Sequence, residues 1–204
     1  MRKRRVRRAC AGAALMLVAL PALAQDPWKD SYAAEAALDY QQAIDALAPV
    51  LDANPDHEFA LMRRGWLNYL AGQYNESLRD YQRALELNDQ SLEARLGIML
   101  PLLAQQRWRQ AAAYGQDVLA VSPWNYFAHL RLLVAEEGLR QWGAVVSRAE
   151  ALSKRYPSDA AALVYLARGL ARQGRTEEAI ATYRRVLERA PYDEESLRYV
   201  AGER

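Results

Sequence analysis

The sequence is poor in the residues that catalytic and metal-binding sites most often use. It holds one cysteine, Cys10, and two histidines, His57 and His129, among 204 residues. The histidines lie 72 positions apart, so they form no local metal site or acid–base pair. No G-x-S-x-G motif or phosphate-binding glycine loop is present, and neighbouring carboxylates such as Glu136 and Glu137 point apart on a helix. We therefore expect no enzyme activity, no cofactor and no metal.

Long apolar runs are also scarce, and the longest lies near the N-terminus. The basic stretch MRKRRVRR is followed by ACAGAALMLVALPALA, which ends in a small-x-small motif before Gln25. This order is typical of a cleavable secretory signal peptide over residues 1–24, with cleavage between Ala24 and Gln25. The run is shorter than the roughly 20 residues of a membrane span. We therefore expect a periplasmic protein without stable membrane insertion; the alternative is an inner-membrane anchor formed by an uncleaved signal.

Acidic residues are absent from this first segment, which distorts the apparent charge of the chain. Residues 1–24 contain six of the 27 Lys and Arg residues and none of the 25 Asp and Glu residues. Without them the chain carries 21 positive and 25 negative side chains, a net charge of −4. Nucleic-acid binding depends on clustered positive charge, so we expect no nucleic-acid partner. The remaining chain also has no cysteine, so no disulfide bond stabilises it.

The most informative feature that is present is an internal repeat. The stretch AGQYNESLRDYQRALELN at 71–88 is matched 102 residues later by QGRTEEAIATYRRVLERA at 173–190. The interval is three times 34, and four columns of residues keep this 34-residue step over five cycles without an insertion. A fixed period of this size indicates stacked units, none of which can bury its apolar face alone. The columns start at Tyr40, Ala43, Val50 and Pro55.

Each unit is predicted to contain two helices. Residues at helical spacing form a stripe over 58–72, Gly72 ends this first helix, and a second amphipathic helix follows over 74–87. Prolines at the ends of the cycles stop the second helix. The chain thereby resembles the tetratricopeptide repeat family, whose second-helix signature is similar to GQYNESLRDYQRALELND and GRTEEAIATYRRVLERAP. The resemblance implies an all-α fold, a right-handed superhelical solenoid of antiparallel helix pairs.

The resemblance covers about residues 28–193 and sets the expected boundaries. A shortened repeat precedes four full ones, and a brief capping helix follows. The expected segments are a signal peptide at 1–24, a shortened repeat at 25–57, full repeats at 58–91, 92–125, 126–159 and 160–193, and a cap at 194–204.

The short cap leads to a prediction about self-association. Repeat arrays generally need a polar cap for solubility, and the helix from Asp193 onward is only about ten residues long. We therefore expect a thinly covered apolar edge on the last repeat, and weak end-to-end association or a partner there. The residues of this edge are Leu163, Leu166, Tyr183 and Val186.

The middle repeats depart from the outer ones in residue size. The large aromatic residue at Tyr81 and Tyr183 is replaced by Gly115 and Ala149. The cluster PWNYF at 123–127 either fills the space beside Gly115 or forms an exposed docking patch.

Pro101 is a second irregularity, because it falls inside a predicted first helix. It removes one helical hydrogen bond and clashes with the carbonyl four residues back, which belongs to Gly97. Gly97 has the freedom to absorb a kink. The kink is either a tolerated irregularity or part of a shaped pocket.

The resemblance also implies where a partner would bind. Members of this family usually hold a peptide or helix of another protein in a concave groove lined by the first helices. The stripe that faces this groove is apolar toward its N-terminal end and carries arginines toward its C-terminal end, so it suits a partner with apolar anchors and a few carboxylates. The candidate groove residues are Met62, Arg63, Trp66, Tyr69, Leu96, Leu100, Leu103, Leu130, Arg131, Val134, Arg168 and Arg172.

An alternative interpretation remains open for part of this stripe. Leu96, Leu103 and Val134 fit the core between repeats as well as they fit a ligand surface. Trp66 fits the core less well, because a large ring one step off the core stripe has less reason to be there. The clamp of lysines and asparagines that the family uses for C-terminal carboxylates is not visible on the stripe.

The expected function is a non-catalytic periplasmic scaffold or adaptor that binds a protein or peptide partner in an envelope assembly. A secretion, pilus, cytochrome-maturation or polysaccharide-export apparatus would fit. The alternative is a small regulatory or cap subunit that binds a polymer or an envelope enzyme and tunes it. Co-purification after mild crosslinking distinguishes these two classes.

Overall fold

The computed structural model describes residues 26–202, in which every regular element is an α-helix. The expected all-helical solenoid is confirmed. The predicted signal peptide lies outside the described residues. The helices are α1 (Pro27–Ala36), α2 (Tyr40–Asp45), α3 (Ala48–Ala53), α4 (Glu58–Leu70), α5 (Tyr74–Leu87), α6 (Leu92–Ala104), α7 (Trp108–Val121), α8 (Tyr126–Gly138), α9 (Trp142–Arg155), α10 (Ala160–Arg172), α11 (Thr176–Leu187) and α12 (Glu194–Val200).

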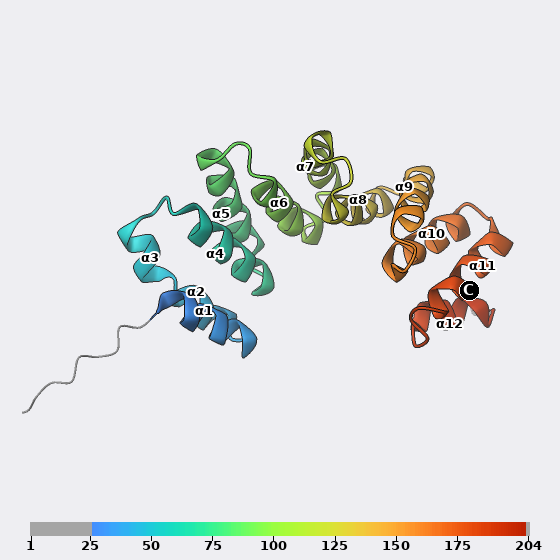
Figure 1. Cartoon of the computed structure of the whole chain (residues 1–204), viewed down its shortest axis with the longest axis horizontal. Helices are drawn as coiled ribbons and strands as arrows, with labels where there is room; N and C mark the ends of the chain where they lie inside the picture. Colours follow the sequence, from blue (N-terminus) through green and yellow to red (C-terminus); the bar gives the residue numbers. More distant parts are fainter. Residues whose placement is uncertain (1–25, 203–204) are drawn as a thin grey trace, which may run out of the picture.

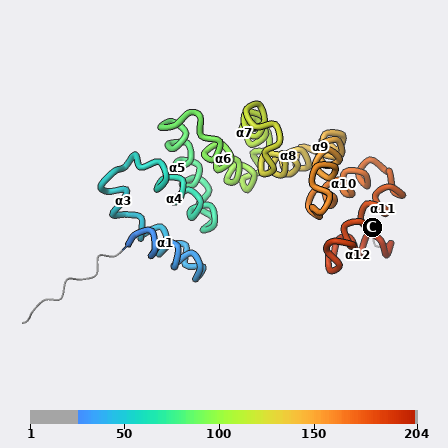
Figure 2. The backbone as a smooth tube through the Cα atoms, viewed as in Figure 1, coloured from blue at the N-terminus to red at the C-terminus, as the bar shows by residue number. Residues whose placement is uncertain are grey.

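These helices are arranged as an arch. Helices α6, α8 and α10 line its inner side, whereas α7, α9 and α11 lie along its outer side (Figure 1). The backbone tube shows the two ends of the described chain at opposite ends of the arch (Figure 2). The first helices of successive repeats therefore share one face of the molecule.

The first helices begin at one repeat position, where a side chain caps each of them. The Nδ1 atom of His57 accepts a hydrogen bond from the N–H of Ala60 at 3.3 Å, and Ser91 Oγ accepts one from Ala94 at 3.1 Å. Such a bond satisfies a donor that the first helical turn leaves unpaired. The same role, at steps of 34 residues, is taken by Asn125, Asp159 and Asp193.

The turn between the two helices of a unit repeats as well. Gly72 and Gly174 adopt φ angles of 75° and 77°, in the left-handed region that glycine enters freely. Leu38, Gln106 and Arg140 occupy the same repeat position with φ angles of 61°, 58° and 56°. A side chain there costs on the order of 1 kcal/mol or more. The packing of the helices therefore imposes this turn even where glycine is missing.

The column predicted from Ala43 lies at the centre of the packing. Small side chains at this position allow the two helices of a unit to approach closely, and each of them is 0 % exposed. The residues are Ala43, Ser77, Ala111, Val145 and Ala179.

The predicted bare edge of the last repeat is absent from the described chain. Helix α12 packs against α11, and the ring of Tyr199 lies 4.6 Å from that of Tyr183. All four edge residues named from the sequence are at most 5 % exposed. The expectation of thin cover was wrong, because even a seven-residue helix covers the edge with a large ring and a buried Ser196. End-to-end association therefore loses the basis on which it was predicted.

Reciprocal changes of residue size explain the departures in the middle repeats. A Cβ atom on Gly97 would lie 2.2 Å from the ring of Tyr81, and one on Gly65 would lie 3.1 Å from it. The ring therefore occupies space that two glycines leave open. In the next unit Met99 stands where Gly65 stood, and its terminal methyl group fills the space beside Gly115. Each large residue faces a small one, so the core density is kept.

The PWNYF cluster does not fill the space beside Gly115, because Met99 and Leu132 already do. Trp124 and Phe127 are instead 46 % and 59 % exposed. Filling beside Gly115, the first of the two roles considered for this cluster, is therefore wrong.

Pro101 is buried in α6 and has no N–H with which to pair the carbonyl of Gly97. One residue earlier, the carbonyl oxygen of Leu96 accepts a hydrogen bond from an Arg131 guanidinium NH group at 2.5 Å. A side chain from α8 thus supports the irregular turn of α6.

Candidate functional site

All twelve candidate groove residues lie on the first helices of the repeats. Helix α4 carries four of them, α6 and α8 carry three each, and α10 carries two. We call this set the inner stripe. Helix α4 contacts α6, and α6 contacts α8, so the stripe runs from one repeat to the next. Its role in binding stays a prediction.

The members of the inner stripe differ in their contacts with the core. Four of them are half-buried and pack against the buried clusters: Met62, Trp66, Leu103 and Leu130. By contrast, Leu96, Leu100 and Val134 are half-buried but lie outside these clusters in the described part of the chain. All seven of these side chains are thus only partly covered, and each leaves some of its surface open to a partner.

The N-terminal end of the stripe is closed by an internal ion pair. A guanidinium nitrogen of Arg63 contacts a carboxylate oxygen of Glu35, and Trp66 Nε1 donates to the other oxygen at 2.7 Å. Burial raises the pKa of the Glu35 carboxyl, but the hydrogen bonds from Trp66 and Arg63 outweigh it and hold the pKa below its ordinary value. Arg63 is only 7 % exposed and its guanidinium stacks on Tyr32 at 3.7 Å. A partner would therefore meet Tyr32 and Trp66 before Arg63.

Sequence reasoning missed that α1 extends the inner stripe. Stepping back 34 residues from Met62, Trp66 and Tyr69 reaches Trp28, Tyr32 and Glu35, which all lie on α1. The 34-residue period alone places these three residues in the stripe, but the predicted stripe included only the four full repeats.

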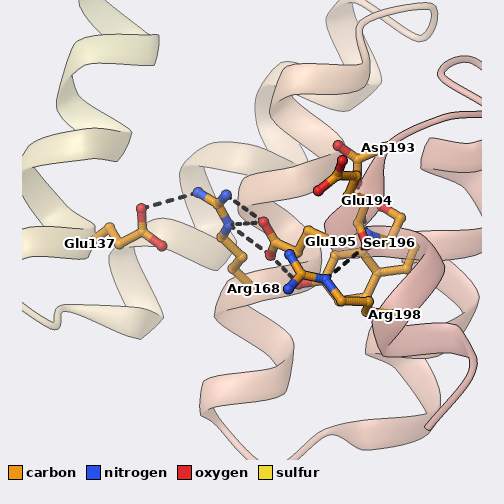
Figure 3. Close-up of polar contacts among 8 residues, drawn as sticks. Glu137, Arg168, Asp193, Glu194, Glu195, Ser196 and Arg198 are labelled. Atoms are coloured by element: carbon orange, nitrogen blue, oxygen red, sulfur yellow. Dashed lines mark hydrogen bonds and ion pairs between the residues drawn. The ribbon is translucent and has the colours of Figure 1, made fainter. Parts of the chain in front are cut away.

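A polar network forms the C-terminal end of the stripe. Arg168 donates to both oxygens of Glu195 at 2.5–3.0 Å and reaches Glu137 at 3.4 Å (Figure 3). The hydroxyl of Tyr183 donates to Glu195 at 2.7 Å. Burial raises the pKa of Glu195, but its bonds to Arg168 and Tyr183 hold the pKa below its ordinary value. Beside this network lies a cavity of about 540 Å³, which Arg172 also lines.

The other two arginines of the stripe differ in exposure. Arg131 is half-buried, and burial lowers its pKa below the ordinary range. Arg172 is exposed, and its guanidinium lies 5.7 Å from the ring centre of Trp142. Arg172 is therefore the stripe cation that is most accessible to a ligand.

His129 belongs to a buried polar cluster behind the stripe rather than to a catalytic site. Its Nε2 lies 3.0 Å from the carbonyl oxygen of Pro123, so Nε2 carries the proton, and Nδ1 accepts from Arg148 at 3.1 Å. Arg148 also donates to both oxygens of Glu136, which is 7 % exposed. The cluster ties the loop before α8 to α9.

This cluster predicts a pH dependence of stability. Burial has the largest effect on His129 and lowers its pKa. The hydrogen bond to Pro123 opposes burial, the Arg148 charge lowers the pKa further and the Glu136 charge raises it, so the pKa lies below its ordinary value. The unfolded chain, with a pKa near 6.5, therefore binds a proton more readily than the folded chain. We expect the free energy of unfolding to fall as the pH drops from 7 to 5.5, measured by urea denaturation.

Two substitutions check the assignment. His129→Gln should remove part of this pH dependence, whereas His57→Gln, which replaces the other histidine, serves as the control. An unchanged pH profile in His129→Gln would contradict the role given to the cluster.

Two further properties concern the described residues only. Between residues 26 and 202, His, Asp and Glu side chains form no group of three or more suited to a metal ion. No helix in that range combines the length and the apolar character needed to cross a bilayer.

Comparisons with known proteins agree with this arrangement. A tetratricopeptide repeat family profile matches residues 130–194, and a second one matches residues 58–91. No curated protein matches the sequence significantly.

Several solved structures have the same fold. MamA from Desulfovibrio magneticus RS-1 is 16 % identical, with a TM-score of 0.74 over 82 % of this chain and 95 % of that one. PilW, a type IV pilus biogenesis factor, is 19 % identical, with a TM-score of 0.76 over 85 % and 80 %. YrrB, a repeat protein with an unusual peptide-binding site, is 14 % identical, with a TM-score of 0.69 over 85 % and 89 %. The profile matches identify tetratricopeptide repeats at residues 58–91 and 130–194, and the solved structures show that the described chain has the fold of tetratricopeptide repeat proteins.

Proposed function

We propose that this protein is a non-catalytic scaffold that holds a segment of another protein against its inner stripe. The observation that carries the proposal is the surface formed by Leu96, Leu100 and Val134, three half-buried apolar side chains on the first helices α6 and α8. Apolar side chains in one continuous row are what an amphipathic helix or an anchored peptide covers. YrrB, a repeat protein of the same fold with an unusual peptide-binding site, supports this use of the fold.

The dimensions of the row indicate the size of the bound segment. Packed helices lie about 8–10 Å apart, so the apolar part of the inner stripe, which extends from Met62 and Trp66 on α4 across α6 to α8, spans roughly 20 Å. A helix rises about 1.5 Å per residue, so about 13 helical residues would cover that span.

We further propose that the protein acts in the periplasm as part of an envelope assembly. The pattern of residues 1–24, which predicts a signal peptide, supports export, and PilW, which shares the fold, is itself a pilus biogenesis factor. The mature protein is expected to begin at Gln25, because the preceding motif fits signal peptidase. Mass spectrometry of the soluble envelope fraction checks this; an intact N-terminus in the membrane fraction would contradict it.

Site-specific crosslinking tests the scaffold proposal. A photoreactive phenylalanine analogue at Leu100 should capture a discrete partner in the envelope, while the same analogue at Leu87 should not. Leu87 is the matched control, because it is an exposed leucine on the second helix α5 and lies outside the inner stripe. The same products from both positions, or none from Leu100, would sink the proposal.

A further inference from the structure

The cavity at the C-terminal end of the inner stripe has a chemistry that the apolar row does not explain. It has a volume of about 540 Å³ and is lined by α8, α10, α11 and α12 side chains. Three arginines contribute to its wall: Arg168, Arg172 and Arg198. Two glutamates, Glu137 and Glu195, are the acidic members of the wall.

The two glutamates are both committed to Arg168. Figure 3 shows Glu137 and Glu195 on opposite sides of its guanidinium group, with bonds of 3.4 Å to the first and 2.5–3.0 Å to the second. Arg168 therefore has its positive charge compensated within the chain. Because the fork of a guanidinium group matches a carboxylate, this pairing also fixes its orientation.

The other two arginines are not compensated in this way. Arg172 lies over the ring of Trp142, and Arg198 Nε donates to the backbone oxygen of Glu194 at 3.3 Å. Within residues 26–202, neither guanidinium group has a carboxylate within ion-pair distance. Both side chains are exposed, so a ligand can reach them. The cavity thus offers two unpaired cations in a chain that is acidic once its signal segment is removed.

The cavity also continues the row of apolar side chains. Arg168 occupies the repeat position of Leu100 and Val134, and Arg198 occupies that of Leu96 and Leu130. A segment that lies along the leucines and continues over α10 and α12 would therefore reach the cavity.

We propose that this cavity binds the side-chain carboxylate of an acidic residue at one end of the partner segment. Arg172 and Arg198 are the side chains that bind this carboxylate. The proposal rests on the proposed function, because the apolar part of the same segment covers the leucines. The bound segment therefore lies in one direction, with its apolar end over α4 to α8 and its acidic end over α10 to α12.

A displayed library of random twelve-residue peptides tests this inference. The peptides are joined to the coat protein through their C-termini, so only side chains supply carboxylates. The full mature chain should enrich apolar peptides that carry Asp or Glu at one end. Arg172→Gln combined with Arg198→Gln should keep the apolar enrichment and lose the acidic one. Arg184→Gln combined with Arg185→Gln, which removes two exposed charges from α11, should keep both.

One selected peptide then gives the magnitude. Synthesised as a C-terminal amide, its Glu→Gln form should bind the native chain and the α11 control about tenfold more weakly, because hydrogen bonds to charged groups typically contribute at least that factor. The two forms should bind the Arg172→Gln, Arg198→Gln chain equally. An acidic preference that survives in this double variant, or apolar peptides without any acidic preference, overturns the cavity assignment and leaves the scaffold standing. No enrichment at all overturns both.

Discussion

Replacing Tyr81 with alanine is expected to lower the free energy of unfolding by about 3–5 kcal/mol, the usual cost of deleting a buried ring. Tyr81 is 6 % exposed, and its ring fills the space between Gly65 and Gly97 on two successive first helices. The glycines cannot close the gap, because they carry no side chains that could move into it. Urea denaturation followed by circular dichroism measures the change.

Two matched variants separate the ring from its hydroxyl and from its neighbours. Tyr81→Phe keeps the ring and should lose less than about 1.5 kcal/mol, the upper range for one hydrogen bond. Gly97→Ala should destabilise by about 1–3 kcal/mol, because its new Cβ would lie 2.2 Å from the ring. In the double variant Tyr81→Ala, Gly97→Ala the two costs should not add, since the methyl group enters the vacated space. Additive costs, or a loss below about 1 kcal/mol for Tyr81→Ala, would contradict this packing.

Leu100→Glu is expected to weaken binding of the crosslinked partner about thirtyfold or more while leaving stability nearly unchanged. Truncating or charging a central anchor typically costs 2 kcal/mol or more of binding, which corresponds to that factor. A carboxylate facing the partner's apolar side chains adds a desolvation cost. In the free protein the new carboxylate can reach water, because the side chain of Leu100 is only half-buried. Leu87→Glu is the matched control for the substitution.

Trp66→Ala should give a different pattern. Its ring packs against two buried clusters and its Nε1 donates to Glu35, so the variant should lose stability as well as binding. Tyr81→Ala is the reference for a structural loss, because its ring is buried between Gly65 and Gly97. If Leu100→Glu lowers the thermal midpoint as far as Tyr81→Ala does while the partner still binds, the leucines belong to the core and the stripe assignment fails.

The 34-residue period made the helical solenoid predictable. It did not predict features for which the residue type changes from one repeat to the next. The column from Ala43 was readable because every member is small, and the structure buries all of them. The N-cap column from His57 to Asp193 was not noticed, because histidine, serine, asparagine and aspartate share only an acceptor atom. A column of similar residue types can be recognised in the sequence, whereas a column that shares only a hydrogen-bonding role cannot.

The ends of the candidate site were less predictable than its middle. The apolar row follows from helical spacing and the 34-residue step alone. The pairs Glu35 with Arg63 and Glu195 with Arg168 join residues 28 and 27 positions apart, and neither interval is a multiple of the period. Such contacts depend on how each terminal helix packs against the neighbouring full repeat, and a column of residues 34 positions apart does not contain this information. The cover that α12 gives to Tyr183 was misjudged for the same reason.

The fit of Tyr81 between two glycines also fixes the order of the repeats. If residues 58–91 were duplicated in tandem, the ring of the first copy would meet the second copy's Arg63, which occupies the repeat position of Gly97. That position has no room for even one carbon atom beyond the backbone. The units are thus alike in length and connection but not interchangeable, so this array cannot grow by copying that unit without a compensating change. At this junction the order of the units is therefore constrained by the steric fit between one repeat and the next.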